Sequence, residues 1–301
     1  MDLNFWMTTA RPLLCLVGIL LHGCEGPPER ARADGGVLRA HAPPSVPLTL
    51  LVILGDSIAH GLGVPEGRAF HSLLLDNDDR RYPEFCGRDL RSLSPAIRRL
   101  DLSRAGARGV DVVRQAKSVA GNPAGRTLVI LSVGLNEFRT SIWSALDRDR
   151  VEARALELIE SLEAIRAHFD DTARFPGGAV LVLLNLYDPT DGAGQPPPAL
   201  DYTYRVLCTC YAAFSLSGNL TLFNRHLARF AEQRALRLLD VHRLFLGHGY
   251  QHENPASPFY HHKDPSLWFQ MDCLHANERG NHEMRRLIWE TIVPQPTRWR
   301  R

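Results

Sequence analysis

The chain has 301 residues, 45% of them hydrophobic, and its 35 basic and 33 acidic side chains leave a formal net charge of +2. This length and composition suit one catalytic-size domain with a full core, and they exclude fibrous, collagen-like and disordered proteins. The near balance of charge, without a basic stripe, argues against nucleic acid as a partner.

The first 23 residues have the pattern of an export signal. An apolar run follows Arg11; it is too short to span a bilayer but has the length of a signal-peptide core. The run ends in Leu21-His22-Gly23-Cys24, which resembles the lipobox of bacterial lipoproteins, where the cysteine sulfur receives diacylglycerol. We therefore expect residues 1–23 to be a signal peptide. We also expect Cys24 to carry a lipid that anchors the protein to a membrane of the bacterial cell envelope.

A soluble periplasmic or secreted form, cut near the same place without a lipid, is the alternative. Met1 and Met7 are both possible starts, and a start at Met7 gives the cleaner signal. Residues 24–46 are rich in proline, glycine, alanine and arginine and lack apolar periodicity, which is typical of a flexible tether. The folded domain is expected over residues 47–301.

Short apolar runs alternate with helical stretches along this domain. The runs are apolar enough for strands covered on both faces, and they lie at 48–56, 98–104, 127–134, 179–188 and 236–241. Residues 151–169 have apolar side chains at helical spacing, which predicts an amphipathic surface helix. Alternation of this kind predicts an α/β fold with a parallel sheet, whose ligands bind at the carboxyl ends of the strands.

The first predicted strand ends in Gly55-Asp56-Ser57, which places a serine hydroxyl at a strand-to-helix turn. The glycines within residues 61–67 have the wrong spacing for a dinucleotide loop, and the G-x-S-x-G elbow of the α/β-hydrolases is absent from the sequence. Such a serine often only caps a helix. It can act as a nucleophile where a base, a carboxylate and oxyanion donors lie nearby.

Other strand ends supply these groups. Asp272 precedes His275 by three residues in a segment past the last predicted strand, so the carboxylate can orient an imidazole that faces Ser57. Asn136 lies at the end of the third predicted strand, and Gly106 follows the second. An amide side chain and a free backbone N–H can both donate to a developing oxyanion.

Together these segments resemble the sequence blocks of the SGNH (GDSL-type) hydrolase family. The matching segments are Gly55-Asp56-Ser57, Gly106, Gly134-Leu135-Asn136 and Asp272-Cys273-Leu274-His275, in the family's order. The resemblance covers about residues 48–293. Glu137 is a departure, because the family usually has aspartate at that position. The resemblance implies a flavodoxin-like three-layer sandwich with a five-stranded parallel sheet.

The same resemblance implies a role for each matching residue. Ser57 would be the nucleophile, His275 the base and Asp272 the acid that orients the base. The oxyanion donors would be the N–H of Ser57, the N–H of Gly106 and the side chain of Asn136. The resemblance implies no cofactor.

Residues 247–271, just ahead of Asp272, contain several histidines and aromatic side chains. Their spacing does not suit zinc, because the adjacent His261 and His262 cannot easily face one ion, and we expect no metal. The aromatic residues predict a wall or lid of an acyl pocket. The insertion at residues 189–214 is expected to border the same site.

Apart from Cys15 and Cys24, the cysteines are Cys86, Cys208, Cys210 and Cys273, which allow three pairings. A disulfide from Cys273 to Cys208 or Cys210 is favoured over free thiols, because export permits disulfides.

The leading hypothesis is an envelope-anchored serine esterase or lipase that hydrolyses carboxylic esters through an acyl-enzyme on Ser57. Its substrate would be a lipid, a small ester or an acetylated glycan. The alternative enzyme is a carbohydrate O-acetylesterase of cell-wall or polysaccharide substrates. The alternative from another class is a non-catalytic surface-binding lipoprotein, against which the intact Ser57, Asp272 and His275 argue.

Overall fold

A computed structural model describes residues 46–138, 147–194 and 218–293. The predicted signal peptide and tether, Cys24, and most of the insertion at 189–214 lie outside these residues. Among the described helices, none has both the length and the apolar character needed to cross a bilayer.

One sheet lies at the centre of the described domain, with strand order β2-β1-β3-β4-β5 and every neighbouring pair parallel. The strands are β1 (Leu48–Gly55), β2 (Arg98–Asp101), β3 (Arg126–Ser132), β4 (Ala179–Leu184) and β5 (Arg237–Leu239). In the register of the sheet, Val52 of β1 pairs with Leu100 and with Val129. The predicted five-stranded parallel sheet is confirmed.

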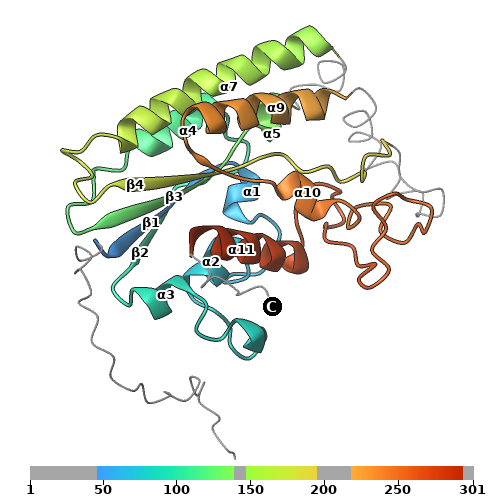
Figure 1. The fold of residues 1–301 in the computed structure, drawn as a ribbon, viewed down its shortest axis with the longest axis horizontal. Coiled ribbons are helices and arrows are strands. Elements are labelled where there is room, and N and C mark those ends of the chain that lie inside the picture. Colours follow the sequence, from blue (N-terminus) through green and yellow to red (C-terminus); the bar gives the residue numbers. More distant parts are fainter. Residues whose placement is uncertain (1–45, 139–146, 195–217, 294–301) are drawn as a thin grey trace, which may run out of the picture. The chain divides into compact units, whose positions relative to one another are not determined.

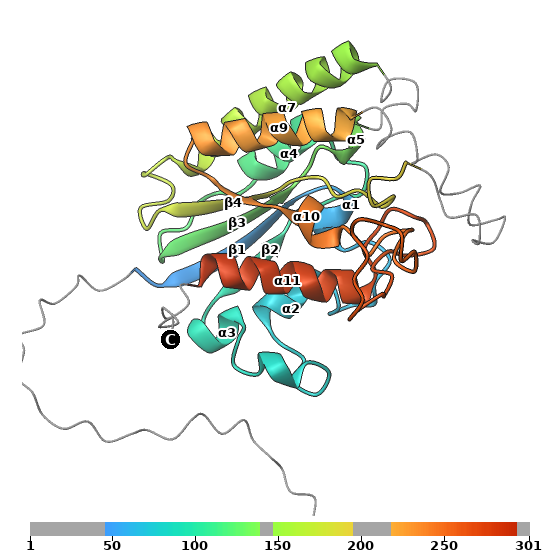
Figure 2. The same cartoon turned by 45° about the vertical axis from the view of Figure 1, so that its right-hand side comes forward.

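Helices cover both faces of the sheet, so the central strands β1, β3 and β4 are largely apolar on both sides (Figure 1). The edge strand β2 instead begins with the exposed Arg98 and Arg99. The described helices are α1 (Ser57–His60), α2 (Phe70–Leu75), η1 (Pro83–Phe85), α3 (Leu90–Leu93), α4 (Gly109–Lys117), α5 (Leu135–Phe138), α7 (Arg148–Phe169), α9 (Asn219–Gln233), α10 (Val241–Phe245) and α11 (Glu278–Ile292). Helices α4, α7 and α9 pack together on one face, and α2 and α11 pack together on the other (Figure 2). The three-layer sandwich is therefore also confirmed.

The amphipathic helix predicted at 151–169 is α7 without its first three residues. Its buried residues include Val151, Ala155, Leu158 and Leu162, which recur at the predicted helical spacing. The helix begins earlier than predicted because Asp147 caps it by accepting hydrogen bonds from the backbone N–H groups of residues 149 and 150.

All five strands end earlier than the predicted apolar runs, and at β2 and β5 an aspartate lies where the strand ends. Asp101, the last residue of β2, accepts hydrogen bonds from the N–H and the hydroxyl of Ser103 and so turns the chain. Asp240 follows β5 and caps α10 by accepting from Arg243 N at 3.0 Å.

The carboxyl ends of the strands form the edge at which the candidate site lies. Figure 1 shows α1 at this edge, together with the loops that follow α10. Gly55 ends β1 with φ +139°, and a Cβ at this position would lie 2.0 Å from the carbonyl oxygen of Ser132. Asp56 N donates to the same oxygen at 3.1 Å, so β1 and β3 touch where the chain turns toward Ser57. Only glycine permits this approach.

Candidate active site

Ser57 is the first residue of α1 and is 8% exposed. The helix cap is the preceding residue, because Asp56 Oδ1 accepts a hydrogen bond from Ile58 N at 2.9 Å. Asp56 is buried, and this burial raises the pKa of its carboxyl to about 7 against the opposing hydrogen bond from Ile58. Since Asp56 caps the helix, the hydroxyl of Ser57 is available for another partner.

That partner is His275. Its Nε2 lies 2.8 Å from Ser57 Oγ, and its Nδ1 is hydrogen-bonded to Asp272 Oδ2. An ionised carboxylate only accepts hydrogen bonds, so Nδ1 carries the proton and Nε2 accepts from the serine hydroxyl. The structure thus brings together the three side chains that the sequence motifs singled out, in the order that a serine nucleophile requires.

Asp272 is held by the backbone of its own loop. Its Oδ1 accepts from Leu274 N at 3.0 Å and from His275 N at 2.9 Å. Partial burial raises the pKa of Asp272, but the hydrogen bonds from the His275 side chain and from these two N–H groups outweigh it and hold the pKa below its usual value. The carboxylate therefore stays ionised beside the imidazole.

The turn that carries Gly106 lies beside the end of β1, because Arg104 N donates to Gly55 O at 3.0 Å. Gly106 has φ +80°. Asn136 Nδ2 donates to Ala107 O at 3.0 Å and so joins the end of β3 to this turn. Among the described residues, the backbone N–H groups of Ser57 and Gly106 donate to no other protein atom, so both are available to an oxyanion.

Glu137, the departure from the family's aspartate, supports the same turn. Its side chain is buried, and Oε1 accepts a hydrogen bond from Gly109 N at the start of α4. Burial raises the pKa of Glu137, against the hydrogen bond from Gly109. The longer side chain thus ties α5 to α4 and leaves Asn136 beside the turn.

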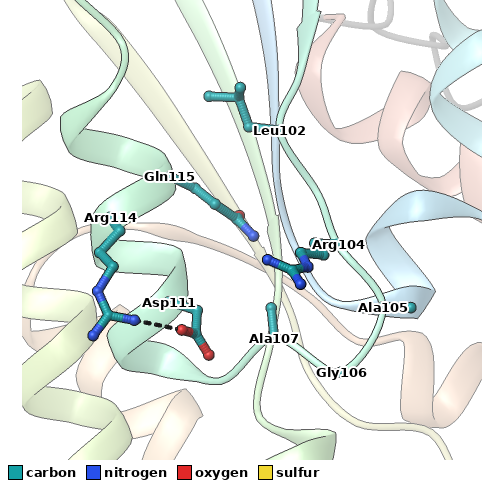
Figure 3. Close-up of a pocket in the computed structure, with 8 residues that line it drawn as sticks. All are labelled: Leu102, Arg104, Ala105, Gly106, Ala107, Asp111, Arg114 and Gln115. Carbon is teal, nitrogen blue, oxygen red and sulfur yellow. Dashed lines mark hydrogen bonds and ion pairs between the residues drawn. The ribbon is translucent and has the colours of Figure 1, made fainter.

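A cavity of about 410 Å³ lies next to this turn, lined by Leu102, Arg104, Ala105, Gly106, Ala107, Asp111, Arg114 and Gln115. Figure 3 shows the turn with α4 across the cavity from it, and the Arg104 and Gln115 side chains pointing into the space between. Gln115 is itself fixed, since it accepts from Gly55 N at 2.8 Å and donates to Gly55 O at 3.0 Å. These two hydrogen bonds fix Gly55, the residue at which β1 turns toward Ser57.

The predicted aromatic wall or lid at residues 247–271 is wrong for its largest side chains. Tyr250, Trp268 and Phe269 are at most 4% exposed and are core residues. Phe269 packs edge-on against Tyr187, with ring centroids 5.2 Å apart. These rings cannot line a pocket because they fill the space behind the loop of Asp272 and His275.

The histidines of the same segment have structural contacts. His248 stacks on Trp268 with ring centroids 3.5 Å apart and on His261 at 4.5 Å. The described residues contain no group of three or more histidine, cysteine, aspartate or glutamate side chains that could hold a metal ion. His282 lies on α11, where it stacks on Tyr82 at 4.2 Å.

Cys273, inside the D-x-x-H segment, is disulfide-bonded, and so is Cys86. The prediction that Cys273 is not a free thiol is therefore confirmed. Cys208 and Cys210 lie outside the described residues, so the predicted pairing of Cys273 with one of them stays a prediction.

No sequence motif identifies Gln270, whose hydrogen bonds hold the loop of Asp272 and His275 in place. Its Nε2 donates to Leu62 O at 2.8 Å and to Ala276 O at 2.9 Å, and its N donates to His275 O at 2.8 Å. It thereby joins the segment after Ser57 to the segment of His275. The Leu62 contact links residues 208 positions apart, and no local pattern marks such a bond.

Comparisons with known proteins agree with the fold and the motifs. The chain is similar to the extracellular lipase of Streptomyces rimosus and to phospholipase A1 of Streptomyces albidoflavus NA297. Each is 16% identical with a TM-score of 0.54, over 81% of this chain and 99% of the other. No curated protein matches this chain in sequence.

At this identity the likeness shows the fold alone. The sequence model of the GDSL-like lipase/acylhydrolase family, however, matches residues 53–282, which contain Ser57, Gly106, Asn136, Asp272 and His275. This chain belongs to the GDSL-like lipase/acylhydrolase family, whose members are hydrolases of the esterase and lipase type.

Proposed function

We propose that this protein is a serine esterase or lipase that hydrolyses carboxylic esters through an acyl-enzyme on Ser57. One observation carries the proposal: Ser57 Oγ lies 2.8 Å from His275 Nε2, while the other ring nitrogen of His275 is hydrogen-bonded to Asp272. A serine hydroxyl needs such a base to attack an ester, because its own acidity is too low.

In the first half of the reaction, Ser57 Oγ attacks the ester carbonyl carbon as His275 Nε2 takes the hydroxyl proton. Negative charge develops on the carbonyl oxygen, where the N–H groups of Ser57 and Gly106 and the amide of Asn136 are the donors. The imidazolium, stabilised by Asp272, then gives its proton to the departing alcohol oxygen. The carbon–oxygen bond breaks and the acyl group stays on Ser57.

In the second half, water attacks the acyl carbonyl carbon and His275 takes one of the water protons. The same donors stabilise the second oxyanion. His275 then returns the proton to Ser57 Oγ as the acid leaves, so the enzyme ends in its starting state.

The test is ester turnover by Ser57→Ala with Ser103→Ala as the matched control. Ser103 also lies near a histidine, with Oγ 3.4 Å from His60 Nδ1, but its hydroxyl donates to Asp101. Acetyl, octanoyl and palmitoyl esters and an acetylated polysaccharide serve as substrates. Turnover should fall to near background in Ser57→Ala and persist in Ser103→Ala. Turnover by Ser57→Ala as fast as that of Ser103→Ala and the unmodified chain would refute the proposal. An unmodified chain without turnover on any ester would favour a binding lipoprotein.

We also propose that the protein is exported and anchored to a membrane by a lipid on Cys24, which rests on the sequence pattern alone. Cys24→Ser should remain unprocessed or become soluble, because no acceptor sulfur is left. The measurement is membrane fractionation with mass spectrometry of the N-terminal peptide. Unchanged membrane association of this variant would contradict the anchor.

A further inference from the structure

The two residues between Asp272 and His275 are held from behind by tyrosine hydroxyls. Tyr250 Oη donates to Cys273 O, and Tyr187 Oη donates to Leu274 O at 2.8 Å. Both rings are buried, at 1% and 4% exposure. Neighbouring carbonyls of the loop thus each accept a hydrogen bond from a different part of the chain.

These carbonyls belong to the same peptide groups that bind Asp272. The carbonyl of Cys273 shares a peptide plane with Leu274 N, and the carbonyl of Leu274 shares one with His275 N. Both N–H groups donate to Asp272 Oδ1, at 3.0 and 2.9 Å. Each tyrosine hydroxyl therefore donates to the carbonyl of a rigid peptide group, and the N–H of the same peptide group donates to the carboxylate of Asp272.

Tyr250 is itself fixed by a second aspartate. Asp191 is 2% exposed, and its carboxylate accepts hydrogen bonds from the N–H groups of Gly247, Gly249 and Gln251 at 2.8, 3.0 and 2.9 Å. Tyr250 N in addition donates to Pro189 O at 2.9 Å. The turn that carries Tyr250 is thus fastened to the segment that follows β4.

Tyr187 also lies in the segment that follows β4. Both tyrosines are therefore held in place by the chain that leaves this strand of the sheet. The ring of Tyr187 stacks on Phe245 of α10 with centroids 4.8 Å apart. Cys273, whose carbonyl accepts the hydrogen bond from Tyr250, has φ +62°, in the left-handed region that disfavours a residue with a Cβ. The loop holds a conformation that its own sequence disfavours, which makes external hydrogen bonds to it consequential.

We propose that Tyr187 and Tyr250 are positioning residues for the acid of the triad. Each forms a relay from tyrosine hydroxyl through one peptide group to Asp272 Oδ1. Hydrogen bonds in such chains polarise one another, so a donor at the carbonyl strengthens the N–H that holds the carboxylate. The relays fix the rotation of the carboxylate and thereby the direction in which it points the His275 ring. The proposal rests on the proposed serine mechanism.

Substitution by phenylalanine removes each hydroxyl and keeps the buried ring. Tyr187→Phe and Tyr250→Phe should each lower kcat roughly tenfold and leave KM within about twofold, because small misplacements of catalytic groups cost rate and neither ring lines the site. Tyr82→Phe is the matched control, since Tyr82 packs on His282 of α11 and should retain full activity. A fluorophosphonate counts the competent molecules, and every variant should label completely, the two positioning variants more slowly.

A double-mutant cycle separates positioning from mere support of the fold. In an Asp272→Ala background the relays have no carboxylate to position. The same tyrosine substitutions should then change the labelling rate by less than about twofold. A tenfold effect in both backgrounds would overturn the proposal, and so would a reduced fraction of labelled molecules with a normal rate for the remainder. If the unmodified chain labels at Ser57 and the tyrosine variants keep full kcat, only the positioning proposal fails. If the unmodified chain does not label at Ser57, the proposed function fails.

Discussion

Asp56 and Ser57 are adjacent, and the structure gives them different tasks. A hydroxyl at a strand-to-helix turn is equally suited to capping the helix and to attacking a substrate. Here Asp56 caps α1, and Ser57 points to His275 at 2.8 Å. The cost falls on Asp56, whose buried carboxyl has its pKa raised to about 7.

The amide of Asn136 gives a residue-scale prediction. Asn136→Ala removes one oxyanion donor and leaves Ser57 and His275 in place, so the rate of ester hydrolysis should fall by about 10²–10³-fold. Labelling of Ser57 by a fluorophosphonate should still reach completion, but slowly. Thermal unfolding serves as the control, because the amide also donates to Ala107 O. A loss below about threefold in a folded variant would exclude Asn136 as an oxyanion donor.

The sequence motifs predicted that Ser57, Asp272 and His275 would lie together. They did not predict the hydrogen bonds that hold the loop of Asp272 and His275 in place. Asp272 and His275 lie three residues apart, so one loop presents both and the spacing is visible in the sequence. The hydrogen bonds of Tyr250 and Tyr187 to this loop join residues 23 and 87 positions apart. Tyr187 ends an apolar run as many core tyrosines do, and Tyr250 lies among glycines and polar residues, so nothing local distinguishes these hydroxyls.

At the scale of elements, the central strands β1, β3 and β4 were predictable because they are covered on both faces and are largely apolar runs. The ends of β2 and β5 were not, since capping by Asp101 or Asp240 depends on where the backbone donors of the next turn lie. The prediction of an aromatic wall or lid before Asp272 is wrong for a related reason. A cluster of rings looks the same in sequence whether it lines a pocket or backs a loop.

The turn from β1 to α1 gives a prediction about stability. Gly55 and Gly67 both have positive φ, but a Cβ on Gly55 would lie 2.0 Å from Ser132 O, whereas a Cβ on Gly67 would have no atom within 4 Å. Gly67→Ala should therefore cost only about 1–2 kcal/mol for its backbone conformation. Gly55→Ala should cost clearly more, because β1 and β3 must separate. Chemical denaturation measures both, and equal losses would mean that the close approach does not matter.

At the scale of the whole molecule, two of the carboxyls that the fold buries outside the proposed triad are Asp56 and Asp191. Burial raises the pKa of Asp56 to about 7, and it also raises that of Asp191 to about 7 against three backbone hydrogen bonds. A carboxyl whose folded pKa is raised holds its proton more tightly in the folded state than in the unfolded state. Its contribution to stability is thus greatest below the unfolded pKa of 3.8 and is lost as pH rises to about 7.

The free energy of unfolding attributable to these carboxyls should therefore fall between about pH 4 and pH 7 and then level off. Asp272 acts in the opposite sense, because its depressed pKa gives stability that is lost in acid. Asp56→Asn keeps an oxygen to cap α1 but cannot ionise, so its profile of denaturation midpoint against pH should be flatter over this range. A profile as steep as that of the unmodified chain would show that Asp56 does not carry the effect.

The central claim is that Ser57 forms the covalent intermediate, and covalent labelling tests it most directly. The unmodified chain should take up one fluorophosphonate group per molecule, and peptide mass spectrometry should locate it on Ser57. Folded Ser57→Ala should take up none, and Ser103→Ala should label like the unmodified chain. Stoichiometric labelling of folded Ser57→Ala would contradict the account, since the nucleophile would then lie elsewhere.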